Sequence, residues 1–249
     1  MPALVGKVCV VNGAASRIGQ AVAERFAKEG GAVVGVDKAG HSVGELSFQA
    51  DLADESQVQA MYAEVVGRYG RLDVIHNNTG LMDRGDGSAL DVSLETWRRV
   101  QDANLTSIFL CCKHGIPHLL STRPAGGSVI NAASFLAAVG SATAPMAYTA
   151  AKAGVVQLTR DLAVHLARSG VRVNAVLFGP VETPEQRAVF ERNPGALEQR
   201  MVHWPMGRFG TLEEAAGAIA FLAGDDSGFI TGAALPLDGG ITEAFTVPE

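Results

Sequence analysis

The stretch Lys7-Val8-Cys9-Val10-Val11-Asn12-Gly13-Ala14-Ala15-Ser16-Arg17-Ile18-Gly19 decides the fold of this 249-residue chain. Residues 7–11 predict a buried strand, small residues then predict a turn, and apolar positions three and four apart predict a helix over residues 18–28. Such a turn lets backbone N–H groups and a helix N-terminus face a pyrophosphate. The stretch therefore predicts the first unit of a nucleotide-binding α/β fold.

The second strand supports the same interpretation. Gly30-Gly31 ends the first helix, residues 32–36 form a β-rich run, and Asp37 closes that run 18 residues after Gly19. A carboxylate at this point accepts a hydrogen bond from an adenosine ribose hydroxyl. Turn and acid together indicate a dinucleotide site. The alternative is that Asp37-Lys38 is a plain exposed charge pair.

Strand-length apolar runs alternate with helical patterns along the rest of the chain. This alternation predicts a parallel sheet covered on both faces, that is, an α/β, doubly wound Rossmann fold of about seven strands. No linker or repeat divides residues 1–249, so we expect a single domain. The expected strands are residues 7–11, 32–36, 47–49, 72–76, 128–131, 171–177 and 233–237, and the expected helices are residues 18–28, 54–69, 93–120 with a bend at Pro117, 147–170 and 211–224.

Composition narrows the classes of partner. A net charge of −6, a pI near 5.5 and the absence of a basic run argue against nucleic acid or an anionic membrane. The three cysteines form no CxxC pair and no signal-peptide pattern is visible, so we expect core thiols in a cytoplasmic protein. Residues 124–151 carry no charge, but glycine, proline and polar residues interrupt them too often for a spanning helix. We expect that stretch to be buried.

A Tyr-x-x-x-Lys pair, Tyr148 and Lys152, lies at the start of the helix expected over residues 147–170. Residues four apart on a helix share a face, so the phenol and the ammonium project to the same side. A free tyrosine has a pKa of roughly 10, and a nearby ammonium favours the phenolate. The pair is therefore suited to proton transfer, although ordinary surface helices contain the same spacing.

Several ordered motifs make residues 5–240 resemble the short-chain dehydrogenase/reductase family. Asn12, Gly13, Arg17 and Gly19 stand at the fixed positions of its Thr-Gly-x-x-x-Gly-x-Gly cofactor turn. The other matches are Asn77-Asn78-Thr79-Gly80 for its Asn-Asn-Ala-Gly element, Asp51 for its acid near the adenine, residues 174–183 for its strand that ends in Pro-Gly, and Asp238-Gly239-Gly240 for its terminal Asp-Gly-Gly. This set of motifs is specific for the family but does not distinguish one member from another.

The resemblance implies the catalytic residues Asn104, Ser134, Tyr148 and Lys152. Tyr148 would act as general acid and base, and Lys152 would lower its pKa and hold the nicotinamide ribose. Ser134 would bond to the substrate oxygen, and Asn104 would anchor a water on the proton path from Lys152. The alternatives are a strand-end turn residue at Ser134 and a solvent-facing asparagine at Asn104.

The resemblance also implies the residues that contact the cofactor and the substrate. NAD(H) is expected in preference to NADP(H), because a carboxylate at Asp37 repels a 2′-phosphate; Lys38 and Arg17 would offset part of this repulsion. The expected cofactor residues are Gly13, Ser16, Arg17, Ile18, Gly19, Asp37, Asp51 (alternatively only a turn residue), Leu52, Asn78, Gly80, Tyr148, Lys152, Gly179, Val181 and Thr183. The expected substrate residues are Ser134, Leu136, Met146, Tyr148 and Phe178, beneath a substrate lid at about residues 184–207.

Three features depart from the family pattern. Arg17 replaces the middle glycine of the turn, Phe178 replaces the proline before Gly179, and the interval from Ser134 to Tyr148 is one residue longer than the commonest spacing. Arg17 either closes over the cofactor phosphates or points to solvent, and both readings stay open at this stage.

These observations predict an NAD(P)-dependent oxidoreductase that interconverts a secondary alcohol and a ketone. A 3-oxoacyl thioester reductase of the same family is one alternative, and a non-catalytic dinucleotide-binding scaffold is another. No metal is expected, because His114 and His118 lie four apart on a helix without an evident third ligand. A small-molecule substrate is the expected partner. The family resemblance and the broadly apolar helix over residues 147–170 favour a homotetramer.

Overall fold

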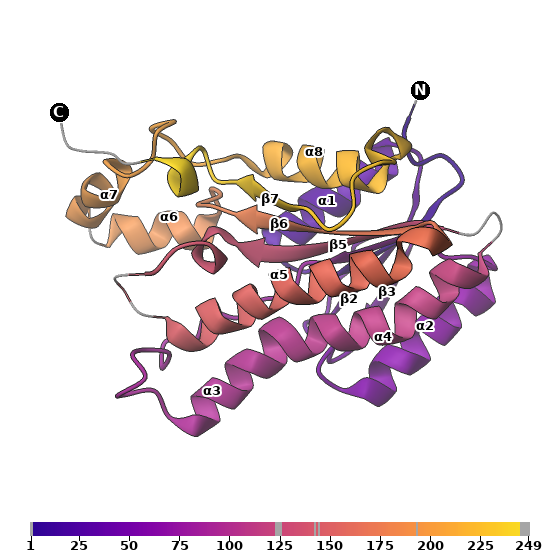
Figure 1. Cartoon of the computed structure of the whole chain (residues 1–249), viewed down its shortest axis with the longest axis horizontal. Coiled ribbons are helices and arrows are strands. Elements are labelled where there is room, and N and C mark those ends of the chain that lie inside the picture. Colours follow the sequence, from indigo (N-terminus) through magenta and orange to yellow (C-terminus); the bar gives the residue numbers. More distant parts are fainter. Residues whose placement is uncertain (1, 123–125, 142, 144, 193, 245–249) are drawn as a thin grey trace.

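A single sheet of seven parallel strands forms the centre of the computed structural model, which describes residues 2–122, 126–141, 143, 145–192 and 194–244. The strand order is β3-β2-β1-β4-β5-β6-β7, and helices cover both faces of the sheet (Figure 1). The chain therefore has the doubly wound, single-domain fold that its sequence predicts. The strands are β1 (Val8–Asn12), β2 (Ala32–Asp37), β3 (Leu46–Gln49), β4 (Val74–Asn77), β5 (Gly127–Ser134), β6 (Val171–Phe178) and β7 (Ala234–Leu237).

Strand β1 lies at the point where the strand order reverses. All of its residues are buried, and Cys9 pairs with Val33 of β2 on one side and with Val74 of β4 on the other. The chain runs outward from β1 through β2 to β3, then returns to the opposite side of β1 as β4. Open parallel sheets bind ligands at such a switch point, beyond the carboxyl ends of the strands.

Two groups of helices cover the two faces. Helices α1 and α8 pack together over one face, and α2, α4 and α5 cover the other (Figure 1). The N-cap residues are Ser16 for α1, Asp54 for α2 and, in a capping box with Glu214, Thr211 for α8. The helices are α1 (Arg17–Lys28), α2 (Glu55–Tyr69), α3 (Leu94–Gln101), α4 (Ser107–Ser121), α5 (Met146–Leu166), α6 (Pro184–Glu191), α7 (Pro194–Met201) and α8 (Leu212–Ala223).

The long helix predicted over residues 93–120 is irregular at a place that the sequence did not indicate. A π-helical turn, η1 (Asp102–Thr106), joins α3 to α4, whereas Pro117 lies inside α4. The side chain of Asn104 donates to Val100 O at 2.9 Å and so competes for a carbonyl that an α-helix pairs with the backbone. Turns of this kind occur frequently at functional sites.

None of the described helices is long and apolar enough to cross a membrane. The charge-free stretch over residues 124–151 includes β5 instead, which is buried from Ser128 to Ser134. The residues that follow β5, 135–141, are partly or fully exposed. The predicted burial of this stretch is therefore right for the strand and wrong for the segment after it.

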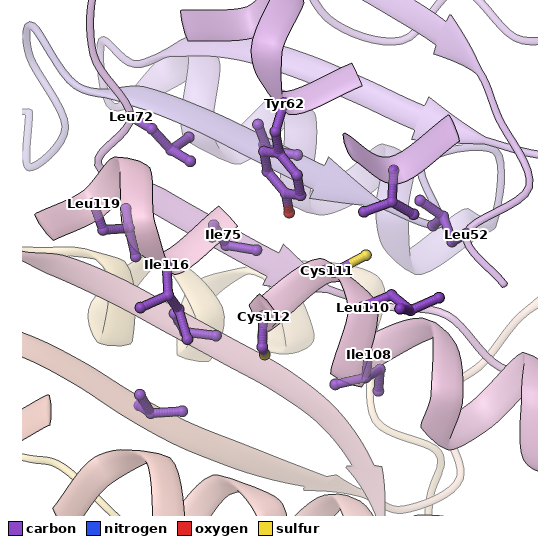
Figure 2. Close-up of a cluster of buried hydrophobic side chains, with 14 of the residues drawn as sticks. Leu52, Tyr62, Leu72, Ile75, Ile108, Leu110, Cys111, Cys112, Ile116 and Leu119 are labelled. Carbon is purple, nitrogen blue, oxygen red and sulfur yellow. The ribbon is translucent and has the colours of Figure 1, made fainter. Parts of the chain in front are cut away.

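Close packing of α2, α4 and β4 forms the centre of the larger apolar core (Figure 2). A β-carbon added to Gly115 would lie 2.5 Å from Ile75 Cδ1 and 2.8 Å from Tyr62 Cζ, so glycine permits this close approach. The free thiols of Cys111 and Cys112 lie in the same cluster, and burial raises the pKa of Cys112 to about 12. The prediction of buried core thiols is confirmed.

A buried row of amide side chains crosses the sheet near the carboxyl ends of β1, β4 and β5. Asn12 Nδ2 donates to Asn77 Oδ1 at 2.8 Å, and Asn77 Nδ2 donates to Asn131 Oδ1 at 2.8 Å. Asn131 Nδ2 then donates to Thr159 Oγ1 of α5 at 3.0 Å. Because three strands and one helix each supply a member, this amide row fixes α5 against the sheet.

Replacing Asn131 with alanine should destabilise the protein by about 2–4 kcal/mol, because Asn77 loses its buried acceptor and Thr159 its donor. Unfolding curves at one fixed protein concentration measure the change. The control is Gln157→Ala, which removes an exposed amide that bonds to Asp161 on α5, and it should cost less than about 0.5 kcal/mol. Equal losses in the two variants would mean that the amide row does not stabilise the fold.

Candidate active site

The ammonium group of Lys152 lies against the carboxyl ends of two neighbouring strands. Lys152 is only 3% exposed, and its Nζ donates to Thr79 O, just after β4, at 3.0 Å and to Ala132 O of β5 at 2.9 Å. Burial lowers the pKa of Lys152 to about 7. This side chain can therefore hold or release a proton near neutral pH.

Tyr148 lies one turn earlier on α5, and the centre of its ring is 5.8 Å from Lys152 Nζ. Burial raises the pKa of Tyr148 above its ordinary value, and a hydrogen bond with Ser134 acts in the opposite direction. From the sequence, Lys152 was expected to be the group that lowers the pKa of Tyr148. In the structure the ammonium bonds to two backbone carbonyls, because a buried cation requires fixed acceptors, and Ser134 is the group that lowers the tyrosine pKa.

Ser134 ends β5 and pairs with Phe178 at the end of β6. Its Oγ also accepts from Leu136 N at 3.2 Å, which caps the short helical turn η2 (Phe135–Ala137). The reading of Ser134 as a strand-end turn residue is therefore confirmed, and its hydrogen bond to a substrate oxygen stays a prediction. The same hydroxyl ends a strand and faces the phenol of Tyr148.

Asn104 is fully buried in η1, so the solvent-facing reading is wrong. Its Oδ1 accepts from Leu81 N at 3.1 Å and its Nδ2 donates to Leu81 O at 2.9 Å. A β-carbon on Gly80 would lie 3.3 Å from Asn104 Oδ1 and 3.5 Å from Lys152 Nζ. Asn104 thus holds the backbone at Leu81. Two residues earlier in the chain, Thr79 O accepts a hydrogen bond from the ammonium of Lys152.

Asp86 contacts the catalytic helix and was not identified from the sequence. Its two carboxylate oxygens accept from Ala147 N at 3.0 Å and from Tyr148 N at 2.9 Å. The N-cap residue of α5, Pro145, makes no side-chain cap of its own. A carboxylate at a helix N-terminus is favoured by the free N–H groups and by the helix dipole. Asp86 thereby sets the start of α5 from a loop about 60 residues away in the chain.

The turn before α1 requires glycine at two positions. Gly13 has φ +80°, and a β-carbon there would lie 2.5 Å from Asn78 O, while one on Gly19 would overlap Gly13 O. Ser16 Oγ donates to Gly13 O at 2.9 Å and accepts from Asn78 Nδ2 at 2.8 Å. The turn is thus locked against the end of β4.

Arg17 begins α1 with helical backbone geometry, so a side chain is tolerated where the family pattern has glycine. The N–H groups of Arg17 and Ile18 have no acceptor among the described residues. The guanidinium of Arg17 is exposed and has no acidic partner in the same part of the chain. Free N–H groups and a guanidinium at a helix N-terminus are the kind of donors that suit an anion.

Asp37 and Asp51 lie beside this turn. Asp37 Oδ2 accepts from Ala15 N at 3.0 Å, and its Oδ1 accepts from Ala39 N at 2.9 Å. Lys38 pairs with Asp51 at 2.6 Å, and this contact lowers the pKa of Asp51. The reading of Asp37-Lys38 as a plain charge pair is therefore wrong, because the partner of the lysine is Asp51.

A cavity of about 1320 Å³ runs from this turn past the carboxyl ends of β4, β5 and β6 to the lid. The predicted site residues that line it are Ser16, Arg17, Ile18, Asn78, Gly80, Ser134, Leu136, Tyr148, Lys152, Phe178, Gly179, Val181 and Thr183. Those outside its lining are Gly13, Gly19, Asp37, Asp51, Leu52, Asn104 and Met146. Met146 was expected to contact the substrate but lies outside the cavity lining, and its Sδ accepts a hydrogen bond from Ala89 N on the loop before α3.

The lid predicted at about residues 184–207 contains α6 and α7, which the sequence analysis did not predict. Thr183 Oγ1 accepts from Gln186 N, and Pro184 is the first residue of α6. A threonine cap followed by proline is a helix start that can be recognised in sequence. A bridge between Val181 and Gly210 joins the two ends of the segment.

Aromatic side chains pack the inside of the lid. The ring centres of Trp204 and Phe209 lie 4.8 Å apart, those of Phe190 and Phe209 5.7 Å, and those of Phe190 and Trp204 6.5 Å. Phe190 and Trp204 are 5% and 8% exposed and also line the cavity. The lid therefore has a small apolar core that continues into the wall of the cavity.

These residues fit a nicotinamide dinucleotide. The free N–H groups of α1 and the guanidinium of Arg17 suit phosphates, and the carboxylate of Asp37 suits a ribose hydroxyl. No group of three or more His, Cys, Asp or Glu side chains in the described ranges is arranged to hold a metal ion. His114 bonds to Glu55 at 2.9 Å instead.

Residues 13–242 match a protein-family model described as Enoyl-(Acyl carrier protein) reductase, within the same superfamily that the sequence motifs indicated. This chain is a short-chain dehydrogenase/reductase. Members of the family use NAD(P)(H), which agrees with the donors and acceptors around the turn.

Two relatives and one solved structure show what this short-chain dehydrogenase/reductase is similar to. It is 39% identical to cis-4-hydroxycyclohexanecarboxylate dehydrogenase of Sinomonas cyclohexanicum, over 96% of this chain and 98% of that protein. It is 35% identical to the 3-oxoacyl-acyl-carrier-protein reductase FabG of Thermotoga maritima, over 96% and 98%. The ligand-free aldohexose dehydrogenase of Thermoplasma acidophilum matches with a TM-score of 0.89 and 32% identity, over 100% and 99%. The chain is thus an NAD(P)-dependent oxidoreductase that interconverts a secondary alcohol and a ketone.

Replacing Asp86 with alanine should lower stability by about 1–2 kcal/mol, because the first N–H groups of α5 lose their acceptor. The kcat should fall at least about tenfold, since Tyr148 N is one of those groups and a small misplacement of a reacting side chain is costly. Steady-state rates and unfolding curves measure both effects. The matched control is Asp91→Ala in the same loop, because the Asp91 carboxylate accepts only from Ser88 among the described residues. Wild-type kcat in the Asp86 variant would show that the cap does not position Tyr148.

Proposed function

We propose that this enzyme moves a hydride between NAD(H) and a secondary alcohol or ketone, with Tyr148 as the proton donor and acceptor. The observation that carries the proposal is the contact of Tyr148 with Ser134 at the cavity wall, with the ammonium of Lys152 one helical turn away. A hydroxyl pair with a titratable amine behind it is what carbonyl reduction and alcohol oxidation require.

The chain supplies the proton chemistry and the positioning. When bound, the nicotinamide provides the hydride donor or acceptor. In reduction, the phenol of Tyr148 gives its proton to the carbonyl oxygen while Ser134 donates a hydrogen bond to the same oxygen. Lys152, with a pKa of about 7, returns a proton toward Tyr148; two of its N–H groups are held by Thr79 and Ala132, and the third remains for the cofactor ribose. Asn104 holds the backbone behind Lys152 through its two bonds with Leu81.

The substrate is a compact, mainly apolar ketone or secondary alcohol. Leu136, Phe178 and Val181 line the cavity near the hydroxyl pair and favour a hydrocarbon body. The relative from Sinomonas cyclohexanicum, by its name, oxidises a hydroxyl group on a cyclohexane ring, and a cyclic secondary alcohol suits this wall. A 3-oxoacyl thioester is the second candidate, supported by the similarity to FabG, and acetoacetyl-CoA as a substrate distinguishes the two. Failure to turn over any member of a carbonyl panel with NADH would favour the non-catalytic scaffold.

The cofactor is NAD(H) in preference to NADP(H). The carboxylate of Asp37 borders the turn at Ala15, where it would repel a 2′-phosphate. Lys38 is paired with Asp51 and is therefore less available to offset this repulsion than its position in the sequence suggests. Arg17, exposed beside two free N–H groups, binds the cofactor phosphates and compensates the helix dipole that otherwise disfavours a cation.

The enzyme is a cytoplasmic homotetramer in this proposal. Phe109 of α4 and Val164 of α5 are exposed apolar side chains, and they support contact with a partner subunit on the side of the molecule that α4 and α5 cover. Light scattering that gives a monomer at micromolar concentration would contradict the assembly. The buried free thiols of Cys9, Cys111 and Cys112 support a reducing compartment.

Tyr148→Phe should lower kcat by about 100- to 10 000-fold while the fold is kept, because only the proton-transferring hydroxyl is lost. Ser134→Ala removes the hydrogen bond that lowers the tyrosine pKa, so alcohol oxidation, which needs the phenolate, should require a higher pH. Rate–pH profiles of oxidation measure both changes. Tyr69→Phe, at a hydroxyl without a hydrogen-bond partner, is the control. Near-wild-type turnover in Tyr148→Phe would remove Tyr148 from the mechanism.

The kcat/KM with NAD(H) should exceed that with NADP(H) by at least about tenfold, and Asp37→Ser should narrow the ratio, because the like-charge contact is lost.

Arg17→Gly should raise the dissociation constant of NADH and reduce its dependence on salt. Fluorescence titration at two ionic strengths measures the second effect. Equal efficiency with both cofactors would contradict the role of Asp37, and an unchanged dissociation constant would leave Arg17 as a tolerated substitution.

A further inference from the structure

The cavity lining, in the part of the chain that the structure describes, contains basic side chains and no carboxylate. Among the lining residues that the structure describes there is no aspartate or glutamate, whereas Arg17, Lys152, Arg200 and His203 are present. Arg17 belongs to the turn before α1 and Lys152 to the catalytic helix. Arg200 lies in α7 of the lid, near the cavity-lining Phe190 and Trp204 at the substrate end. The cavity therefore has a positive group at each end.

Arg200 differs from two neighbouring arginines, Arg187 and Arg208, each of which pairs with a glutamate. Arg187 pairs with Glu182, and Arg208 binds both carboxylate oxygens of Glu214 at 2.9 and 2.7 Å. Arg200 has no acceptor among the described residues, and its guanidinium carbon lies 5.3 Å from the centre of the Phe190 ring. Stacking on an aromatic ring orients a guanidinium while leaving its edge N–H groups free to donate. Arg200 is thus an exposed arginine that stacks on the Phe190 ring and has no acidic partner among the described residues.

We propose that Arg200 binds a carboxylate group carried by the substrate, so that the enzyme acts on a keto acid or the matching hydroxy acid. This assignment rests on the proposed secondary alcohol–ketone chemistry at Tyr148 and Ser134. The apolar side chains of Leu136 and Phe178 would enclose the hydrocarbon between the reacting oxygen and the carboxylate. One guanidinium forms a two-bond pair with a carboxylate and balances its single charge. A phosphate monoester, with a charge of about −2 at neutral pH, would keep an unmatched charge.

Arg200→Gln tests the proposal with two ketones that differ only in charge, 4-oxocyclohexanecarboxylate and its methyl ester. The wild-type kcat/KM should favour the acid by at least about tenfold, and Arg200→Gln should lower it for the acid by about 10- to 100-fold with little change for the ester. The loss should appear mainly in KM, since Arg200 contacts the group that does not react. Arg200→Lys should recover part of the loss. Arg192→Gln, an exposed arginine at the end of α6 outside the cavity lining, is the matched control and should behave as wild type.

Binding without turnover separates this inference from the proposed function. Calorimetric titration with cyclohexanecarboxylate should give tighter binding than with cyclohexanecarboxamide, and Arg200→Gln should abolish the difference. If that result holds while neither ketone is reduced, the carboxylate site stands and the proposed reaction fails. If both ketones are reduced equally well by wild type and Arg200→Gln, the reaction stands and the carboxylate site is overturned. Tighter binding of cyclohexyl phosphate than of the carboxylate would also overturn it.

Discussion

The buried ammonium of Lys152 is the constraint on which the arrangement of the site depends. A cation with so little exposure requires fixed acceptors, and the carbonyls of Thr79 and Ala132 supply them only while β4, β5 and α5 keep their relative positions. Two buried polar groups hold those elements in place. Asn104 binds the backbone just after Thr79, and Asn131, next to Ala132, belongs to the amide row that ends on α5. The amide row therefore supports the buried lysine as well as the sheet.

The acidic groups around the cavity are bonded in ways that leave its interior positive. Asp37 accepts from backbone N–H groups beside the first turn, Asp86 accepts from those at the start of α5, and Asp51 pairs with Lys38. No aspartate or glutamate occurs among the cavity-lining residues in the described part of the chain. A cavity lined in this way suits the phosphates of a dinucleotide.

Local signals predicted much of the fold and part of the site. The helix starts at Asp54 and Thr211 lie where the sequence indicates them, because a cap is an interaction between residues two or three apart. The start of α6 carries an equally local signal that the sequence analysis overlooked. The contact of Asn104 with Leu81 has no such signal, since the two residues are 23 positions apart in the chain.

The sequence by itself determined the doubly wound fold, the family, and the residue types at the first turn, because these follow from apolar periodicity and from motifs of short span. Tertiary structure alone decided which groups touch. In the folded chain the ammonium of Lys152 donates to two backbone carbonyls, and the hydrogen bond with Ser134 acts to lower the pKa of Tyr148. Tertiary structure also brought Asp86 to the start of α5 and Arg200 to the wall of the cavity. Contacts between distant segments depend on how the helices pack on the sheet, and no local pattern in the chain encodes that packing.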